Sequence, residues 1–379
     1  MANFCIFSAR YLPCLGGVER YTYNMARQLT AQGHKVTIIT TNPSTLESCE
    51  IVDGIRIVRL PCVNLLSGRF PVTLYCRMIM KKLHKMKVDF VIVNTRFYIH
   101  SLFGVAFAKK KGIPSIIIEH GTNHFTVNNV FFDALGHIYE HLITSIEKKL
   151  CKNYYGVSKA CNQWLEHFDI KAKGCLYNGI FIEDIEKILC KKNEDCRIKY
   201  GLPHNAKFIF FAGRLVKEKG IEKLIKAVEQ LEEKNIYLLV AGDGDLYNQL
   251  IEEKHANVIF LGKISYESVI CLMKDAEVFC FPTDYPEGFP TVVLEAAAAK
   301  CFVITTQAGG SQELIINEKY GIIMHENTIE EIRDSLSKAL HIDKKPMIER
   351  TYQRLGACFT WEQTCKKLME IYLNAEIKK

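Results

Sequence analysis

The sequence predicts an α/β protein of two doubly wound, Rossmann-like domains that face a cleft. Its 379 residues exceed the roughly 100–200 of a single domain. Short β-rich apolar runs alternate with amphipathic helical stretches, which is typical of parallel sheets covered by helices. This alternation starts again near residue 207, after a charged and irregular stretch at 181–206 that we interpret as the linker. A composition of 48% hydrophobic and 24% charged residues excludes extensive disorder.

The N-terminal half begins with strand, glycine loop, helix and strand. Gly16-Gly17 precedes the first helix, and Gly33-His34 follows it. Ser158 comes after the last apolar run and is suited to cap a helix. The expected strands are Phe4–Phe7, Val36–Thr40, Val88–Val93, Ile113–Ile118 and Tyr154–Val157, and the expected helices are Val18–Gln32 and His100–Lys110.

The C-terminal half repeats this order. Its expected strands are Phe208–Ala212, Tyr237–Ala241, Val258–Leu261, Val278–Phe281 and Phe302–Thr305, and its helices are 220–233, 245–254, 265–275 and 290–299. Glycine and ionisable residues follow each strand. They are Gly213-Arg214, Gly242-Asp243-Gly244, Gly262-Lys263, the stretch Pro282 to Gly288, and Gly309-Gly310. Because ligands of open α/β sheets bind outside the carboxyl ends of the strands, we expect these loops to line one site.

Two cations lie in the first of these loops. Arg214 and Lys219 are five residues apart, just before a helix begins. Cationic side chains beside helix N-terminal amides form an anion pocket suited to a diphosphate. Lys217, between them, is interpreted as an ordinary solvated lysine.

Two carboxylates flank the start of the next helix. Pro290 suits the first helical position, which leaves Glu287 in the loop and Glu295 about one turn inside. The eight-residue spacing is weak alone, but the helix entrance Gly288-Phe289-Pro290 after a strand gives it context. Carboxylates accept hydrogen bonds from sugar hydroxyls, and amides at a helix start attract phosphate oxygens.

The N-terminal half offers two weaker candidates. Gly16 and Gly17 precede a helix, where the backbone can approach a phosphate, although most glycine pairs are only turns. His120 ends a strand and is followed by Gly121, although a histidine is more often structural than functional.

We predict no metal site and no cofactor. His137 and His141 share a helix face, but their helix offers no third ligand, so we interpret them as surface histidines. Asp243-Gly244-Asp245 has a spacing that can hold a divalent cation. We interpret Asp245 instead as the cap of the following helix, because the predicted pocket already contains cations.

Basic residues concentrate in one segment of a chain with a net charge of +7. Residues 69–111 contain ten basic residues and one acidic residue, Asp89. Met78 and Leu83 interleave with these charges at roughly helical spacing, so the segment is either a contact for an anionic membrane or an ordinary solvated face. No aromatic-rich or zinc-type module accompanies it, and we expect no nucleic-acid partner.

The protein is expected to be cytoplasmic. No stretch approaches the roughly 18 apolar residues that cross a bilayer, and the first residues do not resemble a secretory signal. The 15 cysteines are scattered without any CxxC pair, so we expect reduced, structural thiols.

In their order along the chain, these motifs resemble GT-B-fold retaining glycosyltransferases of glycosyltransferase family 4. The motifs are Gly16-Gly17-Val18-Glu19-Arg20, Gly33-His34-Lys35-Val36, Glu119-His120-Gly121, Tyr177-Asn178-Gly179-Ile180, Gly213-Arg214 to Lys219-Gly220, Gly242-Asp243-Gly244, and Glu287 to Ala296. Phe359-Thr360-Trp361 is similar to the start of the family's last helix, which returns to the N-terminal domain. The chain departs from the family at Phe181, where an aspartate is common.

The resemblance implies an N-terminal acceptor-binding domain at 1–181 with the helix 359–379, and a C-terminal donor-binding domain at 182–358. Arg214 and Lys219 would hold the diphosphate of a nucleotide sugar, and Glu287 with the amides of 288–290 the sugar and distal phosphate. Glu295 would bind the ribose and the backbone of Lys263-Ile264 the base, while Gly16, Gly17, Gly213 and Asp243 line the donor site. His120 would touch the donor sugar.

The implied reaction moves a sugar, expected to be UDP-linked, to a glycan or lipid-linked acceptor in cell-surface polysaccharide or lipopolysaccharide synthesis. Fixed cations and amides stabilise the negative charge that grows on the leaving phosphate. Two alternatives stay open: a nucleotide-sugar epimerase or hydrolase on the same scaffold, and a non-catalytic nucleotide-sugar-binding protein. A dinucleotide oxidoreductase is disfavoured because neither domain begins with GxGxxG.

Overall fold

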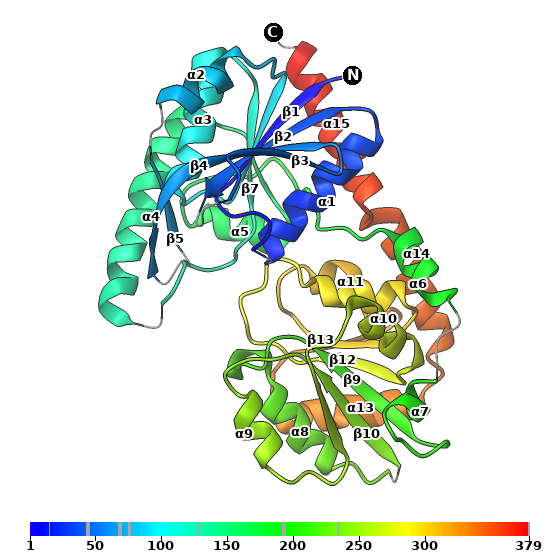
Figure 1. The fold of residues 1–379 in the computed structure, drawn as a ribbon. Coiled ribbons are helices and arrows are strands. Elements are labelled where there is room, and N and C mark those ends of the chain that lie inside the picture. Colours follow the sequence, from blue (N-terminus) through cyan, green and yellow to red (C-terminus); the bar gives the residue numbers. More distant parts are fainter. Residues whose placement is uncertain are drawn as a thin grey trace. The chain divides into compact units, whose positions relative to one another are not determined.

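The chain folds into two compact α/β units. The computed structural model describes residues 1–14, 16–42, 46–66, 70–74, 77–127, 129–191, 195–233 and 235–377. One unit comprises Met1–Asn178 with Trp361–Lys379, and the other comprises Gly179–Thr360. The chain therefore passes from one unit to the other twice (Figure 1). Residues 192–194, in the predicted linker, lie outside the described residues.

The N-terminal unit is built on a mostly parallel sheet with the order β3-β4-β2-β1-β6-β7-β8. The predicted strands are confirmed as β1 (Asn3–Ser8), β2 (Lys35–Asn42), β6 (Phe90–Asn94), β7 (Ser115–Glu119) and β8 (Tyr154–Gly156). Three further strands, β3 (Cys49–Val52), β4 (Ile55–Leu65) and β5 (Phe70–Thr73), were not predicted. Both β3 and β5 run antiparallel to β4, outside the strand–helix alternation on which the prediction rested.

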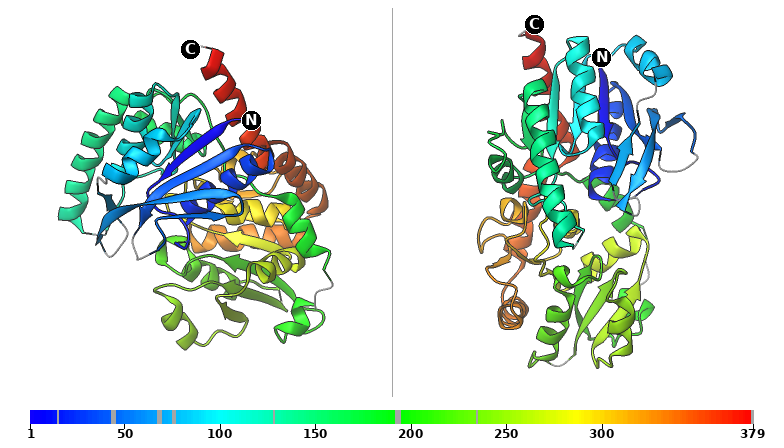
Figure 2. Two further views of the ribbon diagram at one scale, coloured as in Figure 1. Left: turned by 45° about the horizontal axis from the view of Figure 1, so that its top comes forward. Right: turned by 90° about the vertical axis from the view of Figure 1, so that its left-hand side faces the viewer.

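Helices cover this sheet. They are α1 (Gly17–Ala31), α2 (Arg77–Lys85), α3 (Ile99–Lys111), α4 (Val130–Leu150), α5 (Lys159–Glu166) and α15 (Trp361–Ile377). Ser158 caps α5 as predicted, because its side chain accepts a hydrogen bond from the Cys161 amide. The last helix, α15, belongs to the N-terminal unit and packs on α1 (Figures 1 and 2). The rings of Tyr21 and Trp361 meet there at 5.0 Å.

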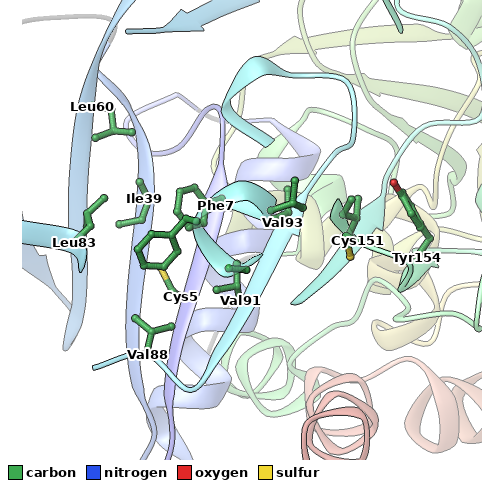
Figure 3. Close-up of a cluster of buried hydrophobic side chains, with 14 of the residues drawn as sticks. Cys5, Phe7, Ile39, Leu60, Leu83, Val88, Val91, Val93, Cys151 and Tyr154 are labelled. Atoms are coloured by element: carbon green, nitrogen blue, oxygen red, sulfur yellow. The ribbon is translucent and has the colours of Figure 1, made fainter. Parts of the chain in front are cut away.

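Apolar side chains of neighbouring strands form the core of the N-terminal unit. Cys5 and Phe7 of β1, Ile39 of β2, and Val91 and Val93 of β6 lie together on one face of the sheet (Figure 3). Cys5 is 1% exposed and acts as a small apolar residue. The cysteines that the structure describes are all free thiols.

The C-terminal unit has a fully parallel sheet with the order β11-β10-β9-β12-β13-β14. Its strands are β9 (Lys207–Ala212), β10 (Ile236–Ala241), β11 (Val258–Gly262), β12 (Val278–Phe281), β13 (Val303–Thr306) and β14 (Ile322–Met324). Its α-helices are α6 (Ile182–Leu189), α7 (Cys196–Lys199), α8 (Ile221–Glu229), α9 (Tyr247–Glu252), α10 (Tyr266–Asp275), α11 (Thr291–Ala298), α12 (Ser311–Leu314), α13 (Ile329–His341) and α14 (Lys345–Cys358). The strand order reverses between β9 and β12, which is where such sheets bind ligands.

Candidate functional site

The loops after β9 and β12 form the centre of the candidate site in the C-terminal unit. Since β9 and β12 are paired neighbours at the point where the strand order reverses, their carboxyl ends lie side by side. The amide of Asp284 donates a hydrogen bond of 2.7 Å to the Glu218 carbonyl, which ties the two loops together. Arg214 and Lys219 come from the first loop, and Glu287 comes from the second.

Lys219 and Glu287 form an ion pair between Nζ and Oε1. Lys219 lies in a short 3-10 turn, Lys217–Lys219, and only 7% of it is exposed. Its ammonium group is also 4.5 Å from the centre of the Tyr285 ring and 5.2 Å from that of Phe281. One carboxylate and two aromatic faces hold the ammonium group of this lysine in a fixed position at the strand ends.

Arg214 also contacts the ring of Tyr285. Its guanidinium carbon is 5.5 Å from the centre of the Tyr285 ring, and the side chain is exposed. The Tyr285 ring therefore lies beside both side chains, Arg214 and Lys219, that are predicted to bind the diphosphate. Sequence reasoning missed Tyr285, although it stands inside the Pro282–Gly288 stretch that was singled out.

Two glycines allow these loops to approach each other. Gly220 has a φ of +73°, and a Cβ there would collide with the Pro282 carbonyl oxygen after β12. Gly242 has a φ of +139°, and a Cβ there would collide with the Gly213 carbonyl oxygen after β9. Both positions require glycine for conformation and for space.

Asp243 and Lys263 extend the site along β10 and β11. Their side chains pair at 3.2 Å, and the pair is largely exposed. The hydrogen bond from Lys263 and that from the Gly244 amide hold the pKa of Asp243 below its usual range. The predicted capping role of Asp245 is wrong: α9 begins at Tyr247, and Leu246 occupies its cap position. The turn between Gly244 and Tyr247 takes up the intervening residues, and so moves the helix start beyond Asp245.

The second loop leads into α11. Pro290 is the residue before the helix rather than its first residue, with a ψ of 113° that is not helical. Glu295 lies one turn inside and is only 4% exposed. Phe289 is buried with its ring 5.3 Å from that of Phe359, so only its backbone is available to a ligand. Ile264, the remaining predicted contact, is half-buried in the loop after β11.

His120 lies at the end of β7 in the N-terminal unit. Its Nε2 is 3.1 Å from Asn94 Oδ1 at the end of β6. The Asn94 amide nitrogen donates to Thr22 Oγ1 at 2.8 Å, so its oxygen faces the histidine and accepts from Nε2–H. Burial lowers the pKa of His120 to about 3, which keeps the ring neutral and leaves a lone pair on Nδ1. Asn94 is a positioning residue that the sequence did not reveal.

The predicted glycine pair, Gly16 and Gly17, lies at the start of a helix that contacts this histidine. Gly16 caps α1 and Gly17 begins it; both are exposed. One turn further, the ring of Tyr21 meets that of His120 edge-on at 4.6 Å. The structure thus connects the helix after the glycine pair with His120 through Tyr21.

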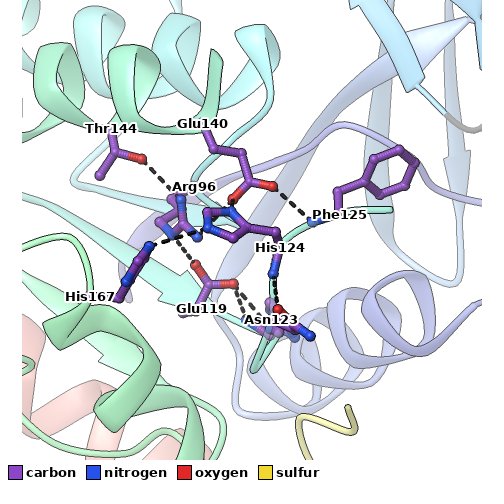
Figure 4. A network of polar contacts seen from close by, with 10 residues as sticks. Arg96, Glu119, Asn123, His124, Phe125, Glu140, Thr144 and His167 are labelled. Atoms are coloured by element: carbon purple, nitrogen blue, oxygen red, sulfur yellow. Dashed lines mark hydrogen bonds and ion pairs between the residues drawn. The ribbon is translucent and has the colours of Figure 1, made fainter. Parts of the chain in front are cut away.

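A buried ionic network supports the loop that carries His120. Glu119 Oε1 accepts hydrogen bonds of 3.0 Å from the amides of His120 and Gly121, and Glu119 Oε2 pairs with Arg96 at 2.7 Å. Arg96 also pairs with Glu140 of α4 at 3.1 Å (Figure 4). Because Arg96 is 1% exposed, it cannot contribute to the basic surface predicted for residues 69–111.

The sequence left the rest of that basic segment open as a membrane contact or a solvated face. Arg69 lies outside the described residues. The lysines Lys81, Lys82, Lys85, Lys87, Lys109 and Lys110 are exposed. Of the two apolar residues singled out in the sequence, Leu83 is 2% exposed and faces inward, as does Ile79, whereas Met78 is 65% exposed. No helix in the described ranges has both the length and the apolar character needed to cross a bilayer.

Helix α4 instead has an exposed apolar face. Phe131 is 69%, Ile138 67% and Leu142 60% exposed. Beside α4, a cavity of about 220 Å³ is lined mainly by apolar side chains, among them Phe70, Phe97 and Phe125. Both features lie in the N-terminal unit.

Comparisons with known proteins cover both units. Residues 15–183 match the family model described as Glycosyltransferase Family 4, and residues 192–354 match that described as Glycosyl transferases group 1. The chain is 27% identical to an uncharacterized glycosyltransferase of Methanocaldococcus jannaschii, with 97% of each chain covered. It is 22% identical to the phosphatidylinositol N-acetylglucosaminyltransferase GPI3 subunit of Saccharomyces cerevisiae, with 99% of this chain and 82% of that protein covered. It is 26% identical to the alpha-monoglucosyldiacylglycerol synthase of Acholeplasma laidlawii, with 92% and 94% covered.

Solved structures show the same fold. Sucrose-phosphate synthase of Thermosynechococcus elongatus superposes with a TM-score of 0.78 at 19% identity, covering 100% of both chains. Anabaena HepE in complex with UDP-glucose superposes with a TM-score of 0.73 at 16% identity, covering 99% of this chain and 100% of that chain. The predicted fold class, two parallel-sheet α/β domains of the GT-B type, is confirmed.

Proposed function

Because the chain belongs to the GT-B-fold glycosyltransferases, with a family 4 N-terminal half and a group 1 C-terminal half, we propose that it transfers a sugar from a nucleotide-diphosphate sugar to a saccharide acceptor with retention of configuration. The observation that carries the proposal is the fixed Lys219–Glu287 pair at the reversal of strand order, with Arg214 on the same aromatic ring. UDP is the proposed nucleotide, as in the HepE complex of the same fold.

The proposed mechanism is electrostatic. As the bond to the leaving diphosphate breaks, negative charge grows on the phosphate oxygen and positive charge on the sugar ring. Lys219 and Arg214 stabilise the former, while the carboxylate of Glu287 binds the sugar hydroxyls. Glu295 binds the ribose hydroxyls, and the backbone at 263–264 binds the base. The leaving phosphate removes the proton of the acceptor hydroxyl, which attacks from the same face.

The N-terminal unit is assigned to the acceptor in this proposal, and His120 to the sugar of the donor. A neutral imidazole with a lone pair on Nδ1 accepts a hydrogen bond from a hydroxyl without repelling the positive sugar ring. The acceptor we propose is lipid-linked, at an anionic membrane surface. Its support is the exposed apolar face of α4, the apolar cavity beside it and the lysines exposed in 81–110. Two relatives that match nearly the whole chain are named for reactions on lipids, one for phosphatidylinositol and the other for the synthesis of alpha-monoglucosyldiacylglycerol.

The function is tested by substituting Lys219 and its neighbour Lys217. Lys217 lies in the same turn but is exposed, so Lys217→Ala is the matched control. We expect Lys219→Ala to lower kcat with UDP-sugars and lipid-linked acceptors by about 100- to 1,000-fold, as for the loss of one transition-state donor. Lys217→Ala should change kcat less than threefold. A folded Lys219→Ala protein with normal turnover would contradict the assignment.

The same assay separates the alternatives. Donor consumption that is equal with and without an acceptor would indicate a hydrolase or epimerase, and donor binding without consumption would indicate a binding protein. The anomeric configuration of the product, read by NMR, tests retention: an α-linked donor should give an α-linked product.

A further inference from the structure

Three histidines of the N-terminal unit come together in the folded chain. His124 lies in the loop after β7, His141 on α4, and His167 directly after α5. One ring nitrogen from each lies within 4.8 Å of the others. His124 Nε2 and His167 Nε2 are 3.2 Å apart (Figure 4). Such a convergence was not expected, because the sequence places only His137 and His141 on one helix.

The spacing of these nitrogens suits a tetrahedral metal ion. Zinc binds imidazole nitrogens at 2.0–2.1 Å, so two ligands at the tetrahedral angle lie about 3.3 Å apart. The His124–His167 pair already has nearly this separation. His141 is exposed on α4, so rotation of its side chain can bring its nitrogen to the same distance.

A carboxylate orients the first of these ligands. His124 Nδ1 lies 3.0 Å from Glu140 Oε2, and a ring N–H there donates to the carboxylate. The nitrogen left with a lone pair is then Nε2, which points toward His167 (Figure 4). Glu140 also accepts from the Phe125 amide at 2.8 Å and pairs with Arg96, so its position is fixed. A carboxylate that holds the outer nitrogen of a histidine is the usual second shell of a zinc ligand.

We propose that His124, His141 and His167 bind one divalent transition-metal ion of the zinc class, with a water molecule as the fourth ligand. Three imidazoles favour zinc, copper or nickel over magnesium or calcium, which prefer oxygen ligands. The ion joins the loop after His120 to α4 and to the end of α5. Binding therefore stabilises the N-terminal unit, and this inference does not depend on the proposed transfer reaction.

Tag-free full-length protein titrated with Zn²⁺ in a calorimeter tests the proposal. We expect one ion per chain and a rise in Tm on binding. Co²⁺ offers a second readout, because Trp164 stacks on His167 at 4.9 Å and meets His124 edge-on at 4.9 Å. Bound Co²⁺ should quench the fluorescence of Trp164, and a Trp164→Phe variant identifies that component of the signal.

Alanine variants separate the proposed histidine ligands from the neighbouring His137. His141→Ala and His167→Ala should each weaken Zn²⁺ binding at least tenfold, and both change exposed side chains. His137→Ala is the matched control on α4, because His137 stacks on His124 at 4.0 Å but is not in the cluster. Absence of saturable binding, undiminished binding in both ligand variants, or an equal loss in His137→Ala would overturn the proposal.

Discussion

At the scale of single residues, Asn94 determines what His120 can do. Its side-chain oxygen accepts from His120 Nε2–H, so the lone pair of the ring lies on Nδ1. With a pKa of about 3, the ring is neutral throughout pH 5–8, and protonation of His120 gives the wild-type activity no pH dependence in that range.

Asn94→Asp should introduce such a dependence. A carboxylate beside Nε2–H favours the imidazolium form and raises the pKa of His120 toward neutrality. As the pH falls through the raised pKa, Nδ1 gains a proton and loses its lone pair. We therefore expect kcat/KM of the variant to fall between pH 8 and pH 5, while the wild-type value stays level. The His120 ring protons, followed by NMR, report the pKa directly. Parallel pH profiles would argue against a role for the lone pair.

Part of the site was predictable from local sequence, and part was not. The loops that follow the strands of a regular α/β alternation converge at the carboxyl edge of the sheet, independently of their exact lengths. These loops contain Arg214, Lys219 and Glu287. Asn94 and Tyr285 depend on the register of β6 and β7 and on the path of one loop, which the alternation does not fix. The three-histidine cluster depends on contacts between α4, α5 and a loop, so no spacing along the chain indicates it.

At the scale of one element, α4 reverses the usual amphipathic pattern. Its buried residues include Glu140, Thr144 and Glu147, whereas Phe131 and Ile138 face outward. The polar side is buried because it surrounds Arg96, which donates to Thr144 Oγ1 at 3.0 Å. A sequence reading that assumes an apolar inner face would assign this helix the wrong orientation.

Glu147 makes α4 sensitive to pH. It is 0% exposed, and burial raises its pKa well above the usual range. The unfolded carboxyl group ionises near pH 4.5, while the folded one stays protonated, so folding takes up a proton and stability falls as the pH rises above 4.5. Glu147→Gln removes this loss, which amounts to at most about 1.4 kcal/mol per pH unit.

Thermal unfolding of both proteins measures the effect. Relative to wild type, we expect the Tm of Glu147→Gln to rise steadily from pH 5 to pH 8. Both proteins retain Glu119, whose pKa is also raised by burial, so the comparison isolates Glu147. A constant difference in Tm across this range would show that Glu147 is ionised in the folded protein.

At the scale of the whole molecule, the alternation of strands and helices predicted both parallel sheets. It did not predict the strands that run antiparallel at the edge of the N-terminal sheet. Each half repeats strand and helix, and a right-handed parallel crossover follows from that repetition. Strands β3, β4 and β5 break it: in β4, Ile55 and Ile57 are buried while Arg56 between them is exposed, the alternation of a strand with one covered face. The return of α15 to the N-terminal unit followed from family resemblance alone, since no local pattern specifies it.

The proposed contact between the protein and a membrane can be tested by a binding experiment with vesicles. On α2, Leu83 is buried and Ile79 packs on the core, while Met78 is 65% exposed, so this helix would give mainly weak, salt-sensitive attraction through its lysines, whereas insertion requires α4. Phe131→Ser with Ile138→Ser removes two exposed apolar side chains of α4. Each contributes about 1.5–3 kcal/mol when fully buried in lipid, so we expect at least a tenfold loss of recovery in flotation with anionic vesicles.

Ile51→Ser with Ile198→Ser is the matched control, because these side chains are 71% and 56% exposed but lie on β3 and α7. It should float like the wild type. Changing Lys81, Lys82 and Lys85 to Gln should reduce the preference for anionic over neutral vesicles at low salt, because it removes charge but leaves the apolar face of α4 intact. Equal recovery of wild type with neutral and anionic vesicles would remove the electrostatic part of the proposal. Equal recovery of the α4 variant and its control would assign the exposed apolar face to some other partner.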